Sequence, residues 1–294
     1  MQVFRRVGSI IHINFWTFLL NFIVLYAFYF VSEPIISIIG TTKRGFFCVD
    51  PSIHYEQKRE QVPTLHLRIY SILLIFCTVI LVEAFRNFYC PSEGEKPTFK
   101  IGKWNVPQYL VTVVTFLGYN QVGFIMNEVL VKYVKSFVGR LRPYFHQICN
   151  PLPIDNCSIH PQNANTFVLE YTCQGHAEEV DEARKSFYSG HSATAMFSAF
   201  WVVLYLQARL KPAIRNNVLV ALLQTLVMIG GLFICCTRIT DNKHHWSDVA
   251  VGIAVGMAVA AGAAVWWGKL FETAEVGDDV EEEKPLEEEM KADV

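Results

Sequence analysis

The sequence predicts an all-α integral membrane protein whose six transmembrane helices form one bundle, with a long loop between the third and fourth helices. Of the 294 residues, 52% are hydrophobic and only 18% are charged, whereas soluble domains contain about 25% charged residues. The mean hydropathy is +0.28. Six windows are also apolar over about 20 residues, which is the length needed to cross the hydrocarbon core of a bilayer.

The six predicted spans are 10–31, 67–85, 106–131, 191–209, 216–236 and 247–267. The first follows Arg5 and Arg6, but it is too long for a signal peptide and has no small-residue cleavage site, so we expect it to span the membrane. Four polar residues interrupt the third span: Asn120, Gln121, Asn127 and Glu128. Polar groups at this depth are expected to face protein or a wet cavity instead of lipid.

A small-residue face marks the sixth span, where Gly252, Gly256 and Ala260 recur every four residues. Small residues at this spacing let two helix backbones approach closely. The partner helix is either a neighbour in the same bundle or a helix of a second copy, so a homo-oligomer stays open.

Charge divides the chain into two parts. Segment 272–294 contains eleven acidic residues and two lysines, which makes it acidic and leaves a basic body. We expect 1–271 to form the membrane domain and 272–294 to be a disordered cytosolic tail. The basic body suits an anionic ligand or headgroup, although basic residues also flank membrane helices for other reasons.

Six spans place both termini on one side and the loops 32–66, 132–190 and 237–246 on the other. Lysine and arginine counts do not distinguish the two sides. The triplet that begins at Asn156 is a glycosylation acceptor, so it predicts that loop 132–190 is extracellular or lumenal and that both termini are cytosolic.

An oxidising compartment would permit disulfides among the loop cysteines, but the sequence does not give their pairing. These cysteines are Cys48, Cys149, Cys157 and Cys173. Three other cysteines lie in the predicted spans and are interpreted as apolar helix residues: Cys77, Cys235 and Cys236. Segment 146–180 is polar and contains prolines, and we expect it to be an irregular loop.

The first of three polar clusters runs from Lys135 to Pro143, just after the third span. Lys135 and Arg142 are seven residues apart, so a continuing helix would place both on one face, and Pro143 would favour ending it there. Both side chains would then point at one anion. The alternative is that these basic side chains only extend to the membrane surface.

The second cluster, Ser189-Gly190-His191, stands directly before an apolar run. The N-terminus of a helix exposes free N–H groups and readily binds anions. Gly190 would permit close backbone approach, Ser189 would cap the helix or donate to an oxyanion, and His191 titrates near neutral pH. A capped helix with an ordinary surface histidine is the alternative.

The third cluster runs from Arg238 to Asp248. If the sixth helix starts near Lys243, His244 and Asp248 share a face and the carboxylate can orient the imidazole for nucleophilic attack. His245 also lies within reach of Asp248, so spacing does not choose between the two histidines. Zinc is a further alternative, but no HxxEH-type pattern is present, and we expect neither a metal nor a cofactor.

The patterns KxxxxxxRP, SGH and RxxxxxHxxxD therefore follow one another in this chain. In this order they resemble the type 2 phosphatidic acid phosphatase superfamily. The sequences GRLRP, FYSGHS and KHHWSD are similar to the motifs of its lipid phosphate phosphatase (phospholipid phosphatase) branch. Two positions depart from common superfamily patterns: Tyr188 stands where many members have proline, and Thr237 where serine is common.

The resemblance implies that His244 attacks phosphorus to form a phosphohistidine, that Asp248 orients its ring, and that His191 protonates the leaving alkoxide and then activates water. It also implies a set of residues that hold the phosphoryl oxygens: Lys135, Arg142, Ser189, Gly190 and Arg238. The implied reaction needs no metal.

The implied substrates are lipid phosphate monoesters held in the bilayer: phosphatidate, lysophosphatidate, ceramide 1-phosphate and sphingosine 1-phosphate, which the sequence does not rank. The active site would face the exterior or a lumen at the plasma membrane or an internal membrane, with a role in lipid signalling and no nucleic acid partner. Two other functions stay open: a phosphatase of another branch acting on polyisoprenyl or sugar phosphates, and a nonenzymatic transporter or binding protein for lipid phosphates.

Overall fold

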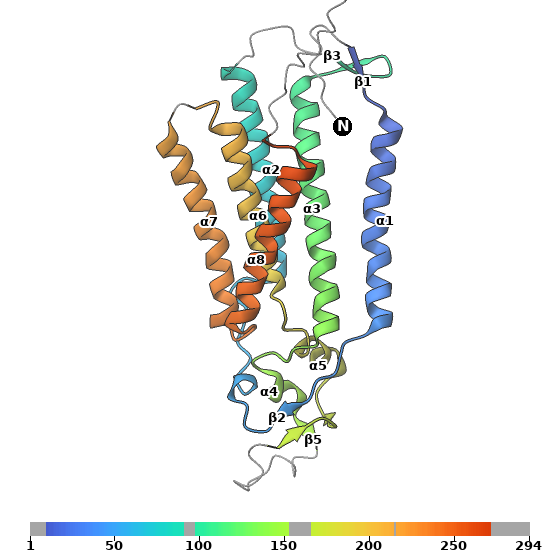
Figure 1. Cartoon of the computed structure of the whole chain (residues 1–294), viewed down its shortest axis with the longest axis vertical. Helices are drawn as coiled ribbons and strands as arrows, with labels where there is room; N and C mark the ends of the chain where they lie inside the picture. The colour runs from blue at the N-terminus through green and yellow to red at the C-terminus, as the bar shows by residue number, and fades with distance from the viewer. Residues whose placement is uncertain (1–9, 91–97, 153–165, 215, 272–294) are drawn as a thin grey trace, which may run out of the picture.

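The computed structural model of the chain describes residues 10–90, 98–152, 166–214 and 216–271. Its main feature is a bundle of six long helices aligned along one axis (Figure 1). They are α1 (Phe15–Ile39), α2 (Thr64–Tyr89), α3 (Gln108–Val138), α6 (Gly190–Tyr205), α7 (Asn217–Thr240) and α8 (Trp246–Gly262). With the turns that extend α6 to Leu210 and α8 to Trp267, all six are long and apolar enough to cross a membrane, which confirms the predicted fold class.

Two helices continue as π-helical turns, α6 through η4 (Leu206–Leu210) and α8 through η5 (Ala263–Trp267). The predicted boundaries were least accurate for the first and third spans. Helix α1 ends eight residues later than expected and continues through Pro34. Helix α3 continues seven residues beyond its apolar window because its last two turns carry Lys132 and Lys135 at the end of the bundle.

Shorter elements cover the two ends of the bundle. At the end where α6 and α8 begin lie η1 (Pro51–Ile53), α4 (Phe145–Cys149), α5 (Ala177–Ala183) and the strands β2 (Phe46–Phe47), β5 (Pro151–Leu152), β6 (Phe167–Val168) and β7 (Thr172–Cys173). At the other end lie β1 (Ile10–His12), β3 (Thr98–Ile101) and β4 (Trp104–Val106). In the sheets, β2 pairs with β6 and β5 with β7, both antiparallel, while β3 pairs with β1 and β4.

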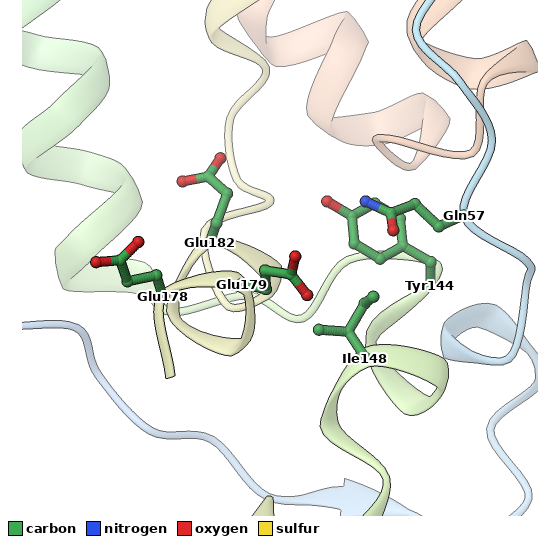
Figure 2. A pocket seen from close by; sticks show the side chains of 6 residues that line it. All are labelled: Gln57, Tyr144, Ile148, Glu178, Glu179 and Glu182. Carbon is green, nitrogen blue, oxygen red and sulfur yellow. The ribbon is translucent and has the colours of Figure 1, made fainter. Parts of the chain in front are cut away.

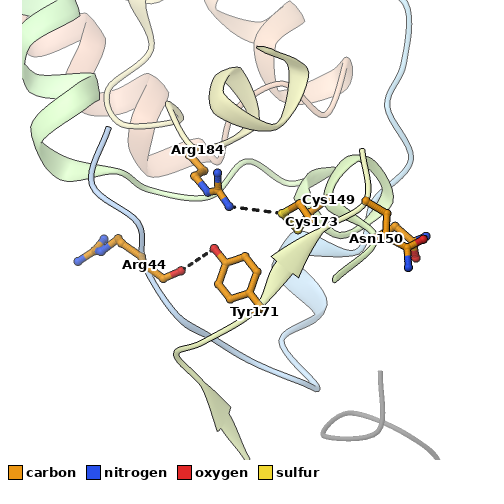
Figure 3. Close-up of a disulfide and its surroundings, with 7 residues drawn as sticks. Arg44, Cys149, Asn150, Tyr171, Cys173 and Arg184 are labelled. Atoms are coloured by element: carbon orange, nitrogen blue, oxygen red, sulfur yellow. Dashed lines mark hydrogen bonds between the residues drawn. A yellow bond between two sulfur atoms is a disulfide. The ribbon is translucent and has the colours of Figure 1, made fainter. Parts of the chain in front are cut away.

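The expectation of an irregular loop over 146–180 is corrected for its described ends, which contain short helices and strands and are ordered by tertiary contacts. A disulfide joins Cys149 to Cys173 with 4.5 Å between their Cα atoms, and an Arg184 Nη2 lies 3.4 Å from Cys173 Sγ (Figure 3). Cys48 is disulfide-bonded as well. Asn156 and Cys157 lie outside the described residues.

Helix α6 lies at the centre of the bundle and contacts α2, α3, α7 and α8. The small-residue face of α8 packs against it: a Cβ added to Gly252 would lie 2.6 Å from the Ser189 carbonyl oxygen, and one added to Gly256 would lie 2.2 Å from that of Ala193. The Ser189 N–H also donates to the Asp248 carbonyl at 3.0 Å. These glycines therefore serve contact within the bundle.

Candidate active site

The three polar clusters meet at the end of the bundle where α3 and α7 end and where α6 and α8 begin (Figure 1). Their charged groups are close enough to act on one another. The ring of His191 experiences the charges of Arg238, Lys135 and Arg142. Arg142 and Lys135 also act on His244. Segments that are more than 100 residues apart in the sequence thus form one positively charged site.

The first cluster changes direction at Gly139, so the expectation of a helix continuing through Arg142 to Pro143 was wrong. Gly139 adopts a left-handed conformation with φ of 60°, and a Cβ there would lie 2.1 Å from the Thr42 carbonyl oxygen. A side chain fits neither the conformation nor the space. Lys135 therefore reaches the site from the helix, while Arg142 reaches it from the following turn.

Arg142 is 5% exposed and forms an ion pair with Glu182, whose side chain is 55% exposed. Its guanidinium also lies over the Tyr144 ring, 5.9 Å from the centroid. The Nε atom of Arg142 is buried and has no hydrogen-bond partner among the described residues. A cavity of about 220 Å³ opens beside this pair (Figure 2); it is lined by Gln57, Tyr144, Ile148, Glu178, Glu179 and Glu182.

The second cluster forms the N-terminus of α6, as expected. The Ser189 hydroxyl oxygen accepts from the Ser192 N–H at 3.3 Å, and Gly190 is the first helical residue. A Cβ on Gly190 would lie 3.0 Å from Val131 Cγ1 and 4.0 Å from Lys135 Nζ. The absence of a side chain at Gly190 therefore lets α3 pack closely against the start of α6. Within the described part of the chain, the buried Nε2 of His191 has no hydrogen-bond partner.

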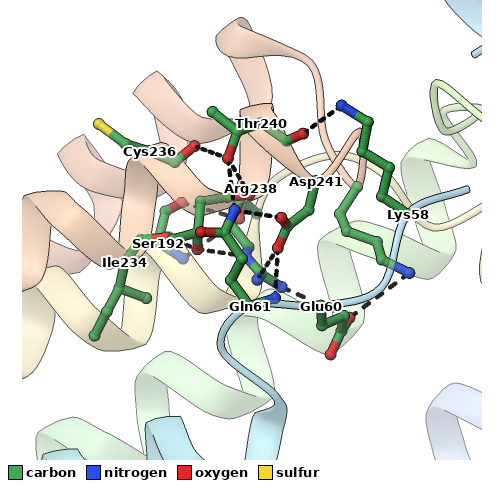
Figure 4. Close-up of polar contacts among 12 residues, drawn as sticks. Lys58, Glu60, Gln61, Ser192, Ile234, Cys236, Arg238, Thr240 and Asp241 are labelled. Atoms are coloured by element: carbon green, nitrogen blue, oxygen red, sulfur yellow. Dashed lines mark hydrogen bonds and ion pairs between the residues drawn. The ribbon is translucent and has the colours of Figure 1, made fainter.

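The third cluster begins with Arg238, which is 1% exposed near the end of α7. Its guanidinium donates to Asp241 Oδ2 at 2.9 Å and lies 3.6 Å from Glu60 (Figure 4). The Gln61 N–H also donates to Asp241 Oδ2 at 2.9 Å. These contacts attach the segment before α2 to the site. Sequence spacing gave no signal for Glu60, which lies far away along the chain, whereas Asp241 is only three residues after Arg238.

The sixth helix starts within one residue of the predicted span 247–267, so the condition of a start near Lys243, which would put His244 on the helix, is not met. Helix α8 begins at Trp246, with His245 at its N-cap, and the Asp248 carboxylate accepts from the His245 N–H at 3.0 Å. His244 therefore lies in the turn before the helix. Its Nδ1 is 3.9 Å from Asp248 Oδ2, which is too long for a hydrogen bond, whereas His245 Nδ1 is 3.1 Å from the same oxygen.

Two residues that the sequence did not single out as site residues surround Asp248. Ser186 Oγ donates to Asp248 Oδ2 at 2.6 Å and lies 3.5 Å from His244 Nδ1, between the carboxylate and the imidazole. Arg140 Nη1 donates to Asp248 Oδ1 at 2.6 Å. Arg140 belongs to the Gly-Arg-Leu-Arg-Pro run, which offered a signal, but nothing in the spacing marks Ser186.

Residues 110–272 of the chain match the model of the PAP2 superfamily. The chain belongs to this superfamily. It is 41% identical over 235 residues to a Caenorhabditis elegans protein named phospholipid phosphatase homolog 1.2 homolog, covering 80% of this chain and 68% of the relative. It is 33% identical to phospholipid phosphatase 1 of Mus musculus, covering 83% of this chain and 81% of the relative. No solved structure matches.

Phospholipid phosphatase 2 of Homo sapiens is a further relative, with 35% identity over 224 residues that cover 74% of this chain and 71% of the relative. The resemblance stated from the motifs is thus confirmed at the level of the superfamily. The PAP2 match also includes all three clusters, because they extend from Lys135 to Asp248.

Burial controls the protonation of His244 in this PAP2 superfamily member. Desolvation lowers the pKa of His244 well below its ordinary value; Asp248 opposes this shift, while Arg142 and Lys135 add to it. The imidazole is therefore neutral at neutral pH, the form with a free electron pair. Within the described residues, no group of three or more His, Cys, Asp or Glu side chains is arranged to hold a metal ion.

Proposed function

We propose that the chain is a lipid phosphate phosphatase that hydrolyses phosphate monoesters at the membrane surface. One observation carries the proposal: the neutral, buried imidazole of His244 lies among the cationic groups of Lys135 and Arg142, beside the cluster that holds His191. Membership of the PAP2 superfamily and the names of the relatives support the same activity.

In the proposed mechanism, Nε2 of His244 attacks phosphorus, because Nδ1 faces Ser186 and Asp248. The phosphorus–oxygen bond to the lipid breaks, and His191 gives a proton to the departing alkoxide, which leaves as the lipid alcohol. His191 then accepts a proton from water, the resulting hydroxide attacks the phosphohistidine, and inorganic phosphate is released with His244 regenerated.

The cations of the site stabilise the charge on the phosphoryl oxygens. The proposed ligands are Lys135, Arg142, Arg238, the Ser189 hydroxyl and the Gly190 N–H. Within the described residues no carboxylate lies within ion-pair distance of Lys135. Its ammonium group is therefore available for an anionic ligand.

The location of the site at helix ends supports lipid substrates over soluble ones. A headgroup can enter the site there while its acyl chain stays in the bilayer. The proposed substrates are phosphatidate, lysophosphatidate, ceramide 1-phosphate and sphingosine 1-phosphate, and the proposed reaction needs no metal. The site is proposed to face the exterior or a lumen, with glycosylation of Asn156 on the same side.

The decisive experiment measures release of inorganic phosphate from these lipids in mixed micelles by purified protein, with EDTA present. We expect turnover by the wild type and loss of turnover in His244→Ala. His245→Ala is the matched control, because this neighbouring histidine also contacts Asp248, and it should keep measurable turnover. Wild-type rates in His244→Ala, or an activity that appears only when a divalent metal is added, would refute the proposal.

A further inference from the structure

A carboxylate lies inside the membrane, close to the site. Glu128 is on α3, ten residues before the helix ends, and is partly buried. Thr194 Oγ1 donates to its Oε1 at 2.8 Å. An ionisable group at such depth is costly and is retained mainly where it serves a function. The mechanism proposed above does not use it.

Helix geometry places this carboxylate just below the phosphate ligands. Glu128, Val131 and Lys135 share one face of α3, and the last two lie around Gly190. Thr194, which holds Glu128, is four residues after Gly190, about one helical turn or 5.4 Å deeper in α6. The carboxylate therefore lies about one turn from the Lys135 ammonium, on the side toward the hydrocarbon core.

Within the described residues, no lysine or arginine lies within ion-pair distance of Glu128, although its charge acts on Lys135. Its other surroundings are polar as well. The Tyr188 hydroxyl experiences its charge and is buried without a hydrogen-bond partner among the described residues. Because an ionised carboxylate has two oxygens and only accepts hydrogen bonds, it can take a donor in addition to Thr194.

We propose that Glu128 is a specificity residue that accepts a hydrogen bond from a hydroxyl or ammonium group on the substrate's carbon skeleton, beside the phosphorylated carbon. This rests on the proposed function. A lipid whose phosphate lies at Lys135 passes Glu128 where its chain enters the bilayer. The distance of about one helical turn between these two side chains fits a donor group that lies a few bonds from phosphorus. Substrates with a free hydroxyl or ammonium there are favoured over those in which this oxygen is esterified.

The test compares lysophosphatidate with its 2-deoxy analogue of the same acyl chain, which lacks only the hydroxyl. In Glu128→Leu, kcat/KM for lysophosphatidate should fall about 10- to 100-fold, as expected for a lost hydrogen bond to a charged group. The same variant should turn over the 2-deoxy analogue as the wild type does. This second rate also reports whether the variant is folded.

Glu33→Gln is the control variant, because Glu33 pairs with Lys132 on the side of α3 that faces α1. It should leave both rates unchanged. An equal fall for both substrates in Glu128→Leu would overturn the proposal, because Glu128 would then only offset the charge of Lys135 or support the fold. Unchanged rates for both would overturn it as well. A wild type that releases phosphate from neither lipid would instead refute the proposed function.

Discussion

Arginines pair with carboxylates at both ends of the bundle, but the exposure of these carboxylates differs. At the end away from the site, the side chain of Arg209 donates to both oxygens of Glu83 at 2.8 Å. Tyr205 donates to the same carboxylate at 2.7 Å, and Arg86 donates to the Arg209 carbonyl at 2.6 Å. The Glu83 side chain is only 6% exposed, whereas that of Arg209 is 24% exposed, so the carboxylate of this pair is withdrawn from solvent.

At the site, the carboxylate that pairs with Arg142 is far more exposed, because the Glu182 side chain is 55% exposed. Arg238 has one acid of each kind: it pairs with Asp241, at 3% exposure, and lies near Glu60, at 32%. Glu182 and Glu60 reach inward from segments outside the bundle, so a phosphate can displace them at little cost in desolvation. We therefore expect the Arg209–Glu83 pair to serve structure and Arg142 to be available for an anion, while Asp241 holds Arg238 in place.

The largest expected effect is at Arg142, where a substitution should lower catalysis and leave stability nearly unchanged. Arg142→Gln should lower kcat/KM about 100- to 1000-fold, or about 2.7–4 kcal/mol, because one donor to the developing charge is lost. Its melting temperature in detergent should change little, because the Glu182 left behind is solvated. A large loss of thermal stability with unchanged kinetics would contradict the comparison.

The next effect belongs to the opposite end of the bundle. Glu83→Gln should lower the free energy of unfolding by about 3 kcal/mol, because removing one partner leaves the Arg209 charge uncompensated. Thermal unfolding in detergent measures this change, while the specific activity of the folded fraction should match the wild type. Glu33→Gln is the control, since its ion pair is exposed and worth less than about 1 kcal/mol. Equal shifts in the two variants would remove the distinction.

A smaller effect is expected at Ser186, which links Asp248 to His244. Ser186→Ala should lower kcat about tenfold with little change in KM, because the carboxylate loses a donor and the imidazole loses the hydroxyl that lies 3.5 Å from its Nδ1. Ser186→Thr keeps the hydroxyl and should recover most of the rate. A fall that threonine does not recover, or one confined to KM, would show that Ser186 does not position His244.

The smallest expected effect is at Glu182, which we expect to compete with phosphate for Arg142. Glu182→Gln should strengthen inhibition by inorganic phosphate a few-fold, because the competing charge is gone while the side-chain shape is kept, a change of about 1 kcal/mol or less. Inhibition constants measured against one lipid substrate provide the readout. Glu179→Gln is the matched control in the same cavity. Weaker inhibition in Glu182→Gln would show that this carboxylate helps to position Arg142.

The sequence predicted the parts of the fold that depend on local pattern. Apolar runs identified all six spans, and the residues around Ser189 identified a helix N-terminus. Helix ends that depend on tertiary contacts were not predictable. Gly139 ends α3 because Thr42 leaves no room for a side chain. Asp248 caps α8 through His245, so His244 lies in the turn before the helix and not on its first turn.

The residues of the candidate site fall into the same two groups, those that the sequence predicted and those that only the folded bundle brings into place. The motif residues could be found because their order and spacing are characteristic. Their partners could not, since Glu60, Glu182 and Ser186 lie in segments whose position depends on the folded bundle. A carboxylate in a short segment between two spans, such as Glu60 or Glu182, has no sequence pattern that shows which arginine it contacts.

The close contact between α6 and α8 has a consequence for how the protein responds to the membrane around it. Gly252 and Gly256 bring the two main chains together, and the Ser189–Asp248 hydrogen bond ties their first turns. The separation of the two histidines is thus fixed by backbone and not by lipid-facing side chains. We therefore expect the spacing of His191 and His244 to depend little on lipid composition, so that lipid-facing residues can change while the proposed catalytic geometry stays the same.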